Sequence, residues 1–489
     1  MLEPVPELRI TPVNDLATNR AGTMVLYWMT AQRRTTWNFA FQRAIEWGVQ
    51  FRRPVVVLEA LRCDYRWNSV RLHRFFVDGM ADNAGRLHGT GVLYYPYLEP
   101  SPGVGKGLLA ALARHACVVV TDDYPCTFLP RMTAAAARQL DVRLEAVDSN
   151  GLLPLRAADV VFTTAYAFRR FLQRALPQHL ERLPSPDPLA HAKLPAAWDP
   201  PVEVLRRWPA AREQDLHAPA GLLSRLAIAK GVPACASRGG ALAGHKASQL
   251  FLKKRLTDYA EHRNEPEAEA SSGLSPYLHF GHVSVHQVFV ELAEHELWSP
   301  RAIAPRVTGK REGWWGMSRS GEAFLDELVT WRELGFNMTS LRPDYDRYES
   351  LPDWARRTLD AHARDAREAV YTLEQFESAA THDALWNAAQ RELLREGRIH
   401  NYLRMLWGKK ILEWTRSPRE ALDVMIELNN KYALDGRDPN SYSGIFWVLG
   451  RYDRPWGPER PVFGTVRYMS SESTARKYGL KSYLARHAE

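Results

Sequence analysis

The chain has 489 residues, which is enough for two or three domains. Hydrophobic residues make up 45% of it and charged residues 25%, a balance that excludes a disordered or fibrous protein. The net charge of +8 favours a polyanionic partner, although many basic proteins bind no nucleic acid. No stretch approaches the run of about 18 apolar residues that a transmembrane helix needs, and the start MLEPVPELRI lacks the pattern of a signal peptide.

The cysteines lie far apart, and none belongs to a CxxC pair. This spacing predicts neither a disulfide framework nor a zinc site, so we expect no metal. A reducing compartment is the simpler interpretation, and we therefore expect a protein that is cytoplasmic or nucleoid-associated. The cysteines are Cys63, Cys117, Cys126 and Cys235.

Short β-branched runs alternate with amphipathic helical stretches in the first third of the chain. This alternation predicts an α/β domain over residues 1–180 with a doubly wound parallel sheet. No glycine-rich phosphate-binding motif is present, so these patterns do not indicate what the domain binds. The predicted strands are residues 23–28, 54–58, 91–95, 117–121 and 142–147, and the predicted helices are residues 36–47, 69–87 and 131–140.

The second half of the chain has a different composition. Residues 181–245 are rich in proline and alanine, which predicts an interdomain linker with one short helix. Helical patterns then replace the strand signal, so we expect an all-α domain over residues 246–489. Its predicted helices are residues 248–263, 283–297, 322–334, 354–363, 373–376, 383–396, 401–415 and 418–432.

Residues 271–281, SSGLSPYLHFG, place glycines, a proline and hydroxyl side chains just before an amphipathic helix. Backbone amides at a helix N-terminus favour an anion such as a pyrophosphate. The alternative is a capped turn with Ser275 as the N-cap residue, and the composition leaves both interpretations open.

Three tryptophans lie in the two predicted helices over residues 383–396 and 401–415. Trp407 and Trp414 are seven residues apart and share one helix face, and Trp386 lies one predicted helix earlier. They are either aromatic core residues, as most such stripes are, or a path for an electron hole from a buried redox cofactor to the surface.

Residues 427–447, ELNNKYALDGRDPNSYSGIFW, form a polar island between apolar stretches. Polar groups inside a helical domain must be paired, and a heterocycle with a donor and acceptor edge is one way to pair them. We expect Arg404 to form an ion pair with Asp435 at this place. A loop capped by its own side chains is the alternative.

Residues 451–467, RYDRPWGPERPVFGTVR, interleave arginines with Tyr452, Trp456 and Phe463. Arginine binds phosphates and aromatic rings stack on unpaired bases, a mixture that suits a distorted or opened nucleic acid. A solvated charged loop is the alternative.

Five segments of the chain occur in the same order as in class II cyclobutane pyrimidine dimer (CPD) photolyases, and the chain resembles that family. These segments are SGLSPYLHFG, THDALWNAAQ, KKILEW, LDGRDPN and DRPWGPERPVFGTVRYM. The resemblance is dense from Lys246 to Met469 and loose in the N-terminal half. It implies light-driven repair of pyrimidine dimers in DNA by electron transfer from excited, reduced FAD to the flipped-out dimer. It also implies a light-harvesting second chromophore, a deazaflavin or a folate, in the N-terminal domain. We take a monomer as the default.

The resemblance assigns roles to residues that occupy matching positions. The residues expected to bind FAD are Tyr259, Ser272, Leu274, Ser275, Arg332, Arg404 and Asp435, with Asn429 opposite flavin N5. The expected photoreduction chain is Trp407, then Trp386, then Trp414, with Tyr371 as a side donor. The residues expected to bind the dimer or its DNA are Glu327, Trp331, Met405, Trp447 and Arg454, with Glu327 as a hydrogen-bond partner of a pyrimidine carbonyl.

A cryptochrome-like blue-light sensor without repair activity is the main alternative, because it shares the fold and the cofactor. Sensors tend to carry a C-terminal extension and to lose lesion-pocket residues. Here the chain ends soon after Met469, and the pocket candidates are all present, so repair is the expected function. A helical nucleic-acid binder without a cofactor would leave SSGLSPYLHFG and DGRDPN unexplained.

Overall fold

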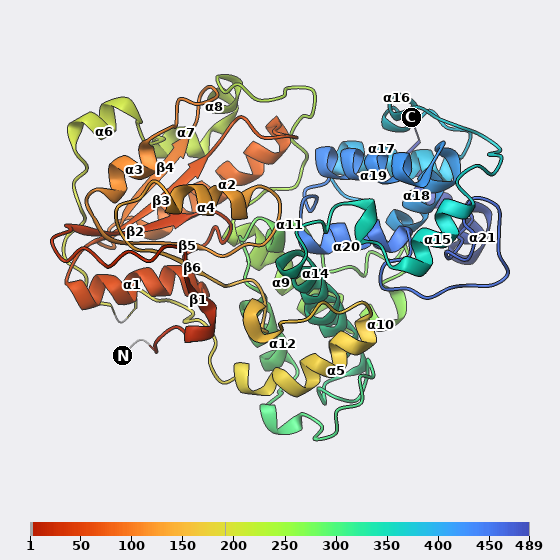
Figure 1. The fold of residues 1–489 in the computed structure, drawn as a ribbon, viewed down its shortest axis with the longest axis horizontal. Coiled ribbons are helices and arrows are strands. Elements are labelled where there is room, and N and C mark those ends of the chain that lie inside the picture. Colours follow the sequence, from red (N-terminus) through yellow and green to blue (C-terminus); the bar gives the residue numbers. More distant parts are fainter. Residues whose placement is uncertain (1–2, 191, 489) are drawn as a thin grey trace. The chain divides into compact units, whose positions relative to one another are not determined.

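The computed structural model describes residues 3–190 and 192–488, and the chain folds into two units (Figure 1). Unit 1 comprises Met1–Ala158, Ala175–Gln249 and Leu274–His295, and unit 2 comprises Asp159–Arg174, Leu250–Gly273 and Glu296–Glu489. The domain boundaries expected at residues 180 and 245 remain a prediction.

A six-stranded sheet forms the centre of unit 1, in the order β1-β6-β5-β2-β3-β4. Strands β2 to β6 pair in parallel, whereas β1 pairs antiparallel with β6. The expected parallel sheet is confirmed, and β1 is an addition that is too short to give a periodic signal. The strands are β1 (Ile10–Pro12), β2 (Met24–Met29), β3 (Val55–Leu61), β4 (Leu93–Leu98), β5 (Ala116–Asp122) and β6 (Leu144–Val147).

Helices cover both faces of this sheet, as β2 illustrates. Leu26 lies in one apolar cluster with Leu112 of α3, and the next residue, Tyr27, lies in another with Phe41 of α1. Successive side chains of a strand point to opposite faces, so the sheet is doubly wound as predicted. The helices of unit 1 are α1 (Phe39–Phe51), α2 (Val70–Leu87), α3 (Leu108–Ala113), α4 (Leu129–Ala137), α6 (Val202–Arg207), α7 (Glu213–His217), α8 (Pro219–Ser224), α9 (Ala241–Lys254, which continues into unit 2), α11 (Ser275–His279) and α12 (Val285–His295).

Unit 2 is helical, as expected for the second half, and its helices approach closely at glycines. A Cβ atom on Gly408 of α18 would lie 2.5 Å from Cγ2 of Val448 in α20, so a side chain there would require Val448 or the helices to shift. The helices are α5 (Ala165–Ala175, whose last residue belongs to unit 1), α10 (Tyr259–His262), α13 (Arg319–Leu325), α14 (Arg332–Leu341), α15 (Asp353–Ala361), α16 (Leu373–Glu377), α17 (Ala384–Glu396), α18 (Asn401–Trp414), α19 (Pro418–Tyr432), α20 (Pro439–Val448), α21 (Ser471–Tyr478) and α22 (Lys481–Arg486).

The helix predicted over residues 322–334 contains a π-helical turn. Helix α13 continues through this turn, η5 (Asp326–Trp331), into α14. Such turns are rare and occur frequently at functional sites. Two candidate site residues, Glu327 and Trp331, lie in η5.

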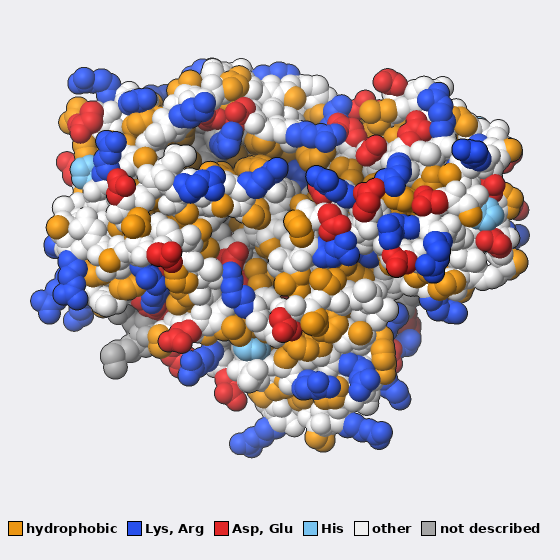
Figure 2. Space-filling view, viewed as in Figure 1, with side chains coloured by type: hydrophobic (Ala, Val, Ile, Leu, Met, Phe, Trp, Pro, Cys, Tyr) orange, Lys and Arg blue, Asp and Glu red, His pale blue; other side chains and the backbone are white. Residues whose placement is uncertain are grey.

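The helices and the surface charges of the protein each exclude one simple interpretation. Within the described residues, no helix is long and apolar enough to cross a membrane. On the face shown in Figure 2, basic and acidic side chains are interspersed, so charge alone does not locate a DNA-binding surface on this face.

Candidate functional site

Three buried indoles form a continuous row in unit 2. The rings of Trp407 and Trp386 are stacked with their centroids 6.4 Å apart and their planes 4° apart. Trp386 in turn meets Trp414 at 6.1 Å with the planes at 70°. The indole N–H of Trp386 donates to the carbonyl oxygen of Trp407 at 3.0 Å, which fixes the stack. The structure therefore brings the three candidate tryptophans together, with Trp386 between Trp407 and Trp414 as the family resemblance implies.

The row continues from Trp414 to the surface of unit 2. The Tyr371 ring lies 5.7 Å from the Trp414 ring, and the His382 ring lies 4.9 Å from it. Trp414 is buried, Tyr371 is half-buried and His382 is exposed. The sequence gives no signal for His382, because an isolated exposed histidine is ordinary at a helix start.

The ion pair expected between Arg404 and Asp435 is confirmed. Its two nitrogen–oxygen distances are 2.9 and 3.2 Å, and the side chains are only 20% and 15% exposed. Such a two-point contact fixes the orientation of both groups. The Nε atom of Arg404 is buried and has no hydrogen-bond partner among the described residues.

Much of the polar island around this pair is paired within the protein. Asn429 is buried, and its amide donates to Ser441 Oγ at 2.8 Å. The Oδ1 atom of Asn430 accepts from the backbone N–H of Arg437 at 2.8 Å, and Asp438 caps the start of α20. Self-capping therefore explains the loop residues, whereas the Arg404–Asp435 pair is a separate side-chain contact.

The remaining FAD candidates are distributed over both units. Tyr259 is buried at the start of α10, and the guanidinium of Arg332 lies 4.6 Å above the Phe336 ring. The chain passes from unit 2 to unit 1 within SSGLSPYLHFG, so Ser272 belongs to unit 2 and Leu274 and Ser275 to unit 1.

Helix α11 starts at Ser275, and its N-cap is Leu274, which makes no side-chain cap. The alternative in which Ser275 is the N-cap is therefore wrong, because the serine is already the first helical residue.

Glu327 is held by a neighbour that the sequence did not reveal. Its Oε1 atom lies 2.6 Å from NH1 of Arg263. Desolvation by the surrounding protein raises the pKa of Glu327, and the charge of Asp326 adds to this, although Arg263 acts in the opposite direction. Its side chain is nevertheless 36% exposed, so the carboxyl group is accessible. A carboxyl group with a raised pKa retains its proton more readily and can donate a hydrogen bond.

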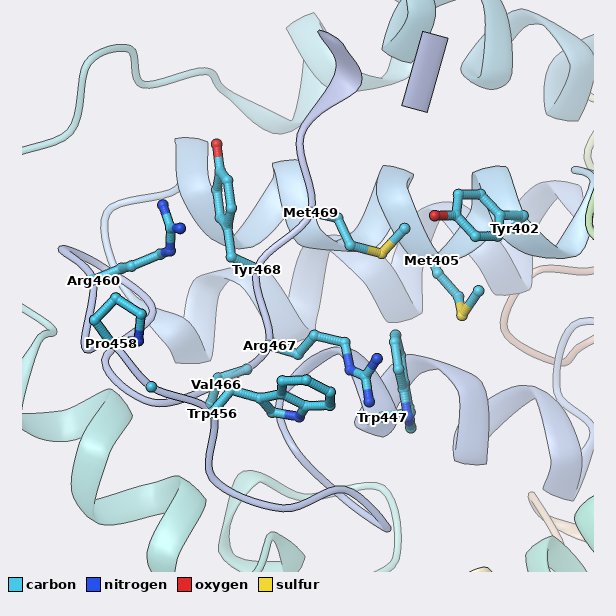
Figure 3. A pocket seen from close by; sticks show the side chains of 11 residues that line it. Tyr402, Met405, Trp447, Trp456, Pro458, Arg460, Val466, Arg467, Tyr468 and Met469 are labelled. Carbon is cyan, nitrogen blue, oxygen red and sulfur yellow. The ribbon is translucent and has the colours of Figure 1, made fainter. Parts of the chain in front are cut away.

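A cavity of about 380 Å³ opens in unit 2 (Figure 3). Met405 of α18 and Trp447 of α20, two of the candidates for the dimer pocket, line it. Glu327, Trp331 and Arg454 are not among the lining residues. Met405 and Trp447 therefore share one cavity, and the other three lie outside its lining.

The arginine-rich segment forms one wall of this cavity in an ordered arrangement. The guanidinium of Arg467 lies 3.9 Å above the Trp456 ring and 5.6 Å from the Trp447 ring (Figure 3). The Asp453 carboxylate accepts hydrogen bonds from Arg467 Nε at 2.9 Å and from Trp456 Nε1 at 3.1 Å. Arg454 packs on the same ring at 4.4 Å. These contacts argue against a merely solvated loop.

One arginine of this segment has a structural role. Arg451 is buried and donates to the carbonyl oxygen of Tyr345 at 2.8 Å. Burial lowers the pKa of its guanidinium to about 10. Arg451 therefore anchors the loop, and composition alone could not distinguish it from the accessible arginines.

The chain thus combines an α/β unit with a helical unit that holds a row of buried tryptophans. The chain is similar to a crystal structure of a bacterial class III photolyase from Agrobacterium tumefaciens, with a TM-score of 0.67 and 16% identity over 97% of this chain and 88% of that one. This likeness shows the fold. No protein-family model matches the chain.

Two relatives are similar in sequence over nearly the whole chain. The deoxyribodipyrimidine photo-lyase of Methanothermobacter thermautotrophicus is 34% identical over 483 residues, which cover 98% of this chain and 97% of that protein. The deoxyribodipyrimidine photo-lyase of Arabidopsis thaliana is 32% identical over 475 residues, or 94% of this chain and 88% of that protein. The chain belongs to the deoxyribodipyrimidine photo-lyase family and is an enzyme.

Proposed function

We propose that this enzyme is a class II photolyase that repairs cyclobutane pyrimidine dimers in DNA by light-driven electron transfer. The observation that carries the proposal is the row of three buried indoles that leads to the surface, in a chain one-third identical to photo-lyases over almost its full length. A row of this kind serves the reduction of a buried redox cofactor.

The residues of unit 2 fit FAD. The Nε atom of Arg404 is a buried donor with no partner among residues 3–190 and 192–488, and the ion pair with Asp435 offers an acceptor beside it. Together they match the donor and acceptor edge of a flavin ring. Tyr259, Ser272 and Arg332 are the proposed partners of the rest of the cofactor in this unit, and the roles of Leu274 and Ser275 rest on the family resemblance. When bound, FAD supplies the electron that splits the dimer.

The side chains around the cavity then bind and orient the lesion. Trp447 and Met405 offer apolar walls for a flipped-out dimer, and Trp331 in η5, which lies outside the cavity lining, offers another flat ring. Glu327, whose pKa is raised by desolvation, is the proposed hydrogen-bond partner of a pyrimidine carbonyl. Arg454 and Arg460 supply contacts to phosphates.

Two experiments test the cofactor and the lesion pocket. Asp435→Asn should weaken FAD retention in the purified protein, because the Arg404 guanidinium loses its anionic partner. Trp447→Ala should weaken binding to a thymine-dimer oligonucleotide about tenfold, since stacking contributes about 1–3 kcal/mol per base. Trp198→Ala in unit 1 is the matched control and should bind as wild type does. Unchanged dimer binding by Trp447→Ala would contradict the pocket assignment.

A blue-light sensor is the second candidate, because it shares the fold and FAD. The ordered stack of Arg467 on Trp456 beside Trp447 favours repair, since a sensor does not need an aromatic and basic cavity for DNA. Flavin bands without selective binding of dimer-containing DNA would favour the sensor.

We also propose that unit 1 binds a light-harvesting chromophore, a deazaflavin or a folate. The strand order changes direction between β5 and β2, and ligands of such sheets bind at the carboxyl ends of the strands there. Mass spectrometry of the extracted chromophores tests this. Monomeric state and a cytoplasmic or nucleoid location remain predictions, and sedimentation tests the former.

A further inference from the structure

The tryptophan row ends in a hydrogen bond to which the proposed function assigns no role. The hydroxyl oxygen of Tyr371 lies 2.5 Å from Nδ1 of His382, and the two rings are stacked 5.9 Å apart. Both rings also contact Trp414. An oxidisable phenol, a base and the last indole of the row are therefore in mutual contact.

The surrounding hydrogen bonds leave the Tyr371 hydroxyl able to donate in this contact. The backbone N–H of His382 donates to the Tyr371 hydroxyl oxygen at 3.0 Å. The hydroxyl group thus already accepts one hydrogen bond, and its single hydrogen is available to donate. Nδ1 of His382 accepts that hydrogen when the imidazole carries its own hydrogen on Nε2. In this tautomer the phenolic proton is directed at a base.

We propose that His382 accepts the phenolic proton when Tyr371 is oxidised, so that the pair is the terminal electron and proton donor of the row. This rests on the proposed function, because the oxidant is the tryptophan radical cation that photoreduction leaves at Trp414. One electron passes from Tyr371 to Trp414. The O–H bond of Tyr371 breaks, and its proton forms an N–H bond at Nδ1 of His382. The products are neutral Trp414, a neutral tyrosyl radical and an imidazolium, so the single positive charge moves from the indole to the imidazole.

Burial and charge favour this direction. Trp414 is buried, whereas His382 is exposed and can pass the proton to water. The ammonium group of Lys410 lies 5.3 Å from the centre of the Trp414 ring and is paired with Glu413 at 2.6 Å, so no unpaired anion of this pair holds the positive charge on the indole. Without a base, the electron transfer would have to produce a phenol radical cation, which is unfavourable.

Flash photolysis of the FAD-loaded enzyme tests the inference, with electron paramagnetic resonance to distinguish tryptophanyl from tyrosyl radicals. In the wild type, a tyrosyl radical should replace the tryptophan radical, more slowly in D₂O than in H₂O. His382→Ala should slow this replacement at least about tenfold, the lower range for a positioned proton acceptor, and added imidazole should restore part of the rate. Tyr371→Phe should form no tyrosyl radical. His88→Ala, an exposed histidine of unit 1, is the control and should match the wild type.

The outcomes separate this inference from the proposed function. One outcome is that the tryptophan radical forms normally and the tyrosyl radical appears equally fast in the wild type and in His382→Ala. This outcome overturns the role of His382 and leaves the tryptophan row intact. If no tryptophan radical forms, the tryptophan row does not carry the electron, and both the proposed role of the row and this inference are overturned. A readout that needs no light is the ¹⁵N chemical shift of the His382 side chain. It should show the Nε2–H form with Nδ1 as an acceptor, and the signal should move in Tyr371→Phe. A Nδ1–H form would contradict the assignment.

Discussion

Replacing the buried Lys409 by methionine should stabilise the protein below pH 7. Lys409 is fully buried beside the cavity, where its ammonium group donates to the carbonyl oxygen of Val448 at 2.6 Å and lies 4.9 Å from the Trp447 ring centre. No carboxylate forms an ion pair with it in the described part of the chain. Desolvation lowers the pKa of Lys409 from 10.5 to about 7, with the charge of Asp453 acting in the opposite direction. Holding the charge there therefore costs about 5 kcal/mol.

Methionine has a similar length and no charge, so Lys409→Met removes this cost. It also loses the hydrogen bond to Val448, which contributes about 2 kcal/mol for a charged donor. The net gain in unfolding free energy should be about 3 kcal/mol at pH 6, within the range found when buried charges are replaced by apolar residues.

The gain should depend on pH in a defined direction. Below pH 7 the folded and the unfolded wild type both carry the proton on Lys409, and the cost is present in full. Above pH 7 the folded protein releases this proton while the unfolded chain retains it up to about pH 10.4, so the wild type becomes more stable by about 1.4 kcal/mol per pH unit. The advantage of Lys409→Met should therefore decrease from pH 7 to pH 9.

Urea denaturation at pH 6, 7, 8 and 9 measures this difference. The matched control is Lys410→Met, which removes the adjacent lysine, whose ammonium group pairs with Glu413 at 2.6 Å, and which should not stabilise the protein. A destabilised Lys409→Met at pH 6, or an advantage that does not change with pH, would refute the reasoning.

Three further predictions concern the relay, the helix packing and the DNA contacts. Trp386→Phe should abolish photoreduction of the bound flavin, because the indole between Trp407 and Trp414 is lost. Steady-state absorption under blue light measures this, and an unchanged rate would contradict the electron-transfer role of the tryptophan row. Gly408→Ala should lower the unfolding free energy by about 1–3 kcal/mol in denaturation experiments, because the new Cβ would lie 2.5 Å from Cγ2 of Val448. The control is Gly444→Ala in α20, whose Cβ meets no atom within 4 Å, and it should be neutral or stabilising. Arg460→Ala should weaken binding to damaged and intact DNA alike and reduce the salt dependence by about one phosphate contact, and a loss confined to damaged DNA would contradict this role.

The parts of the fold with strong periodicity were predictable. The runs that became β2 to β6 are β-branched and short, and the alternation with helices was sufficient for the doubly wound sheet. β1 was missed because three residues carry no period. The π-helical turn η5 was missed because apolar spacing indicates a helix without reporting one wider turn.

The candidate site was predictable where residues lie within one motif and unpredictable where it depends on contacts across the fold. The order of Trp407, Trp386 and Trp414 was implied by the family resemblance, and the Arg404–Asp435 pair followed from a polar island that needed a partner. No local pattern indicates that Arg263 reaches Glu327 or that His382 reaches Tyr371, because each pair is brought together only by the packing of separate segments. The burial of Arg451 was likewise invisible in a segment whose composition suggested phosphate contacts.

The most direct test of the proposed repair function is to incubate the purified, FAD-loaded enzyme with a thymine-dimer oligonucleotide in the dark and under blue light, and to record the absorbance of restored thymine. We predict restoration only in the light, and restoration about tenfold slower with Trp447→Ala at enzyme concentrations below its weakened dissociation constant. A protein with bound, photoreducible flavin that restores no thymine in the light would contradict the account.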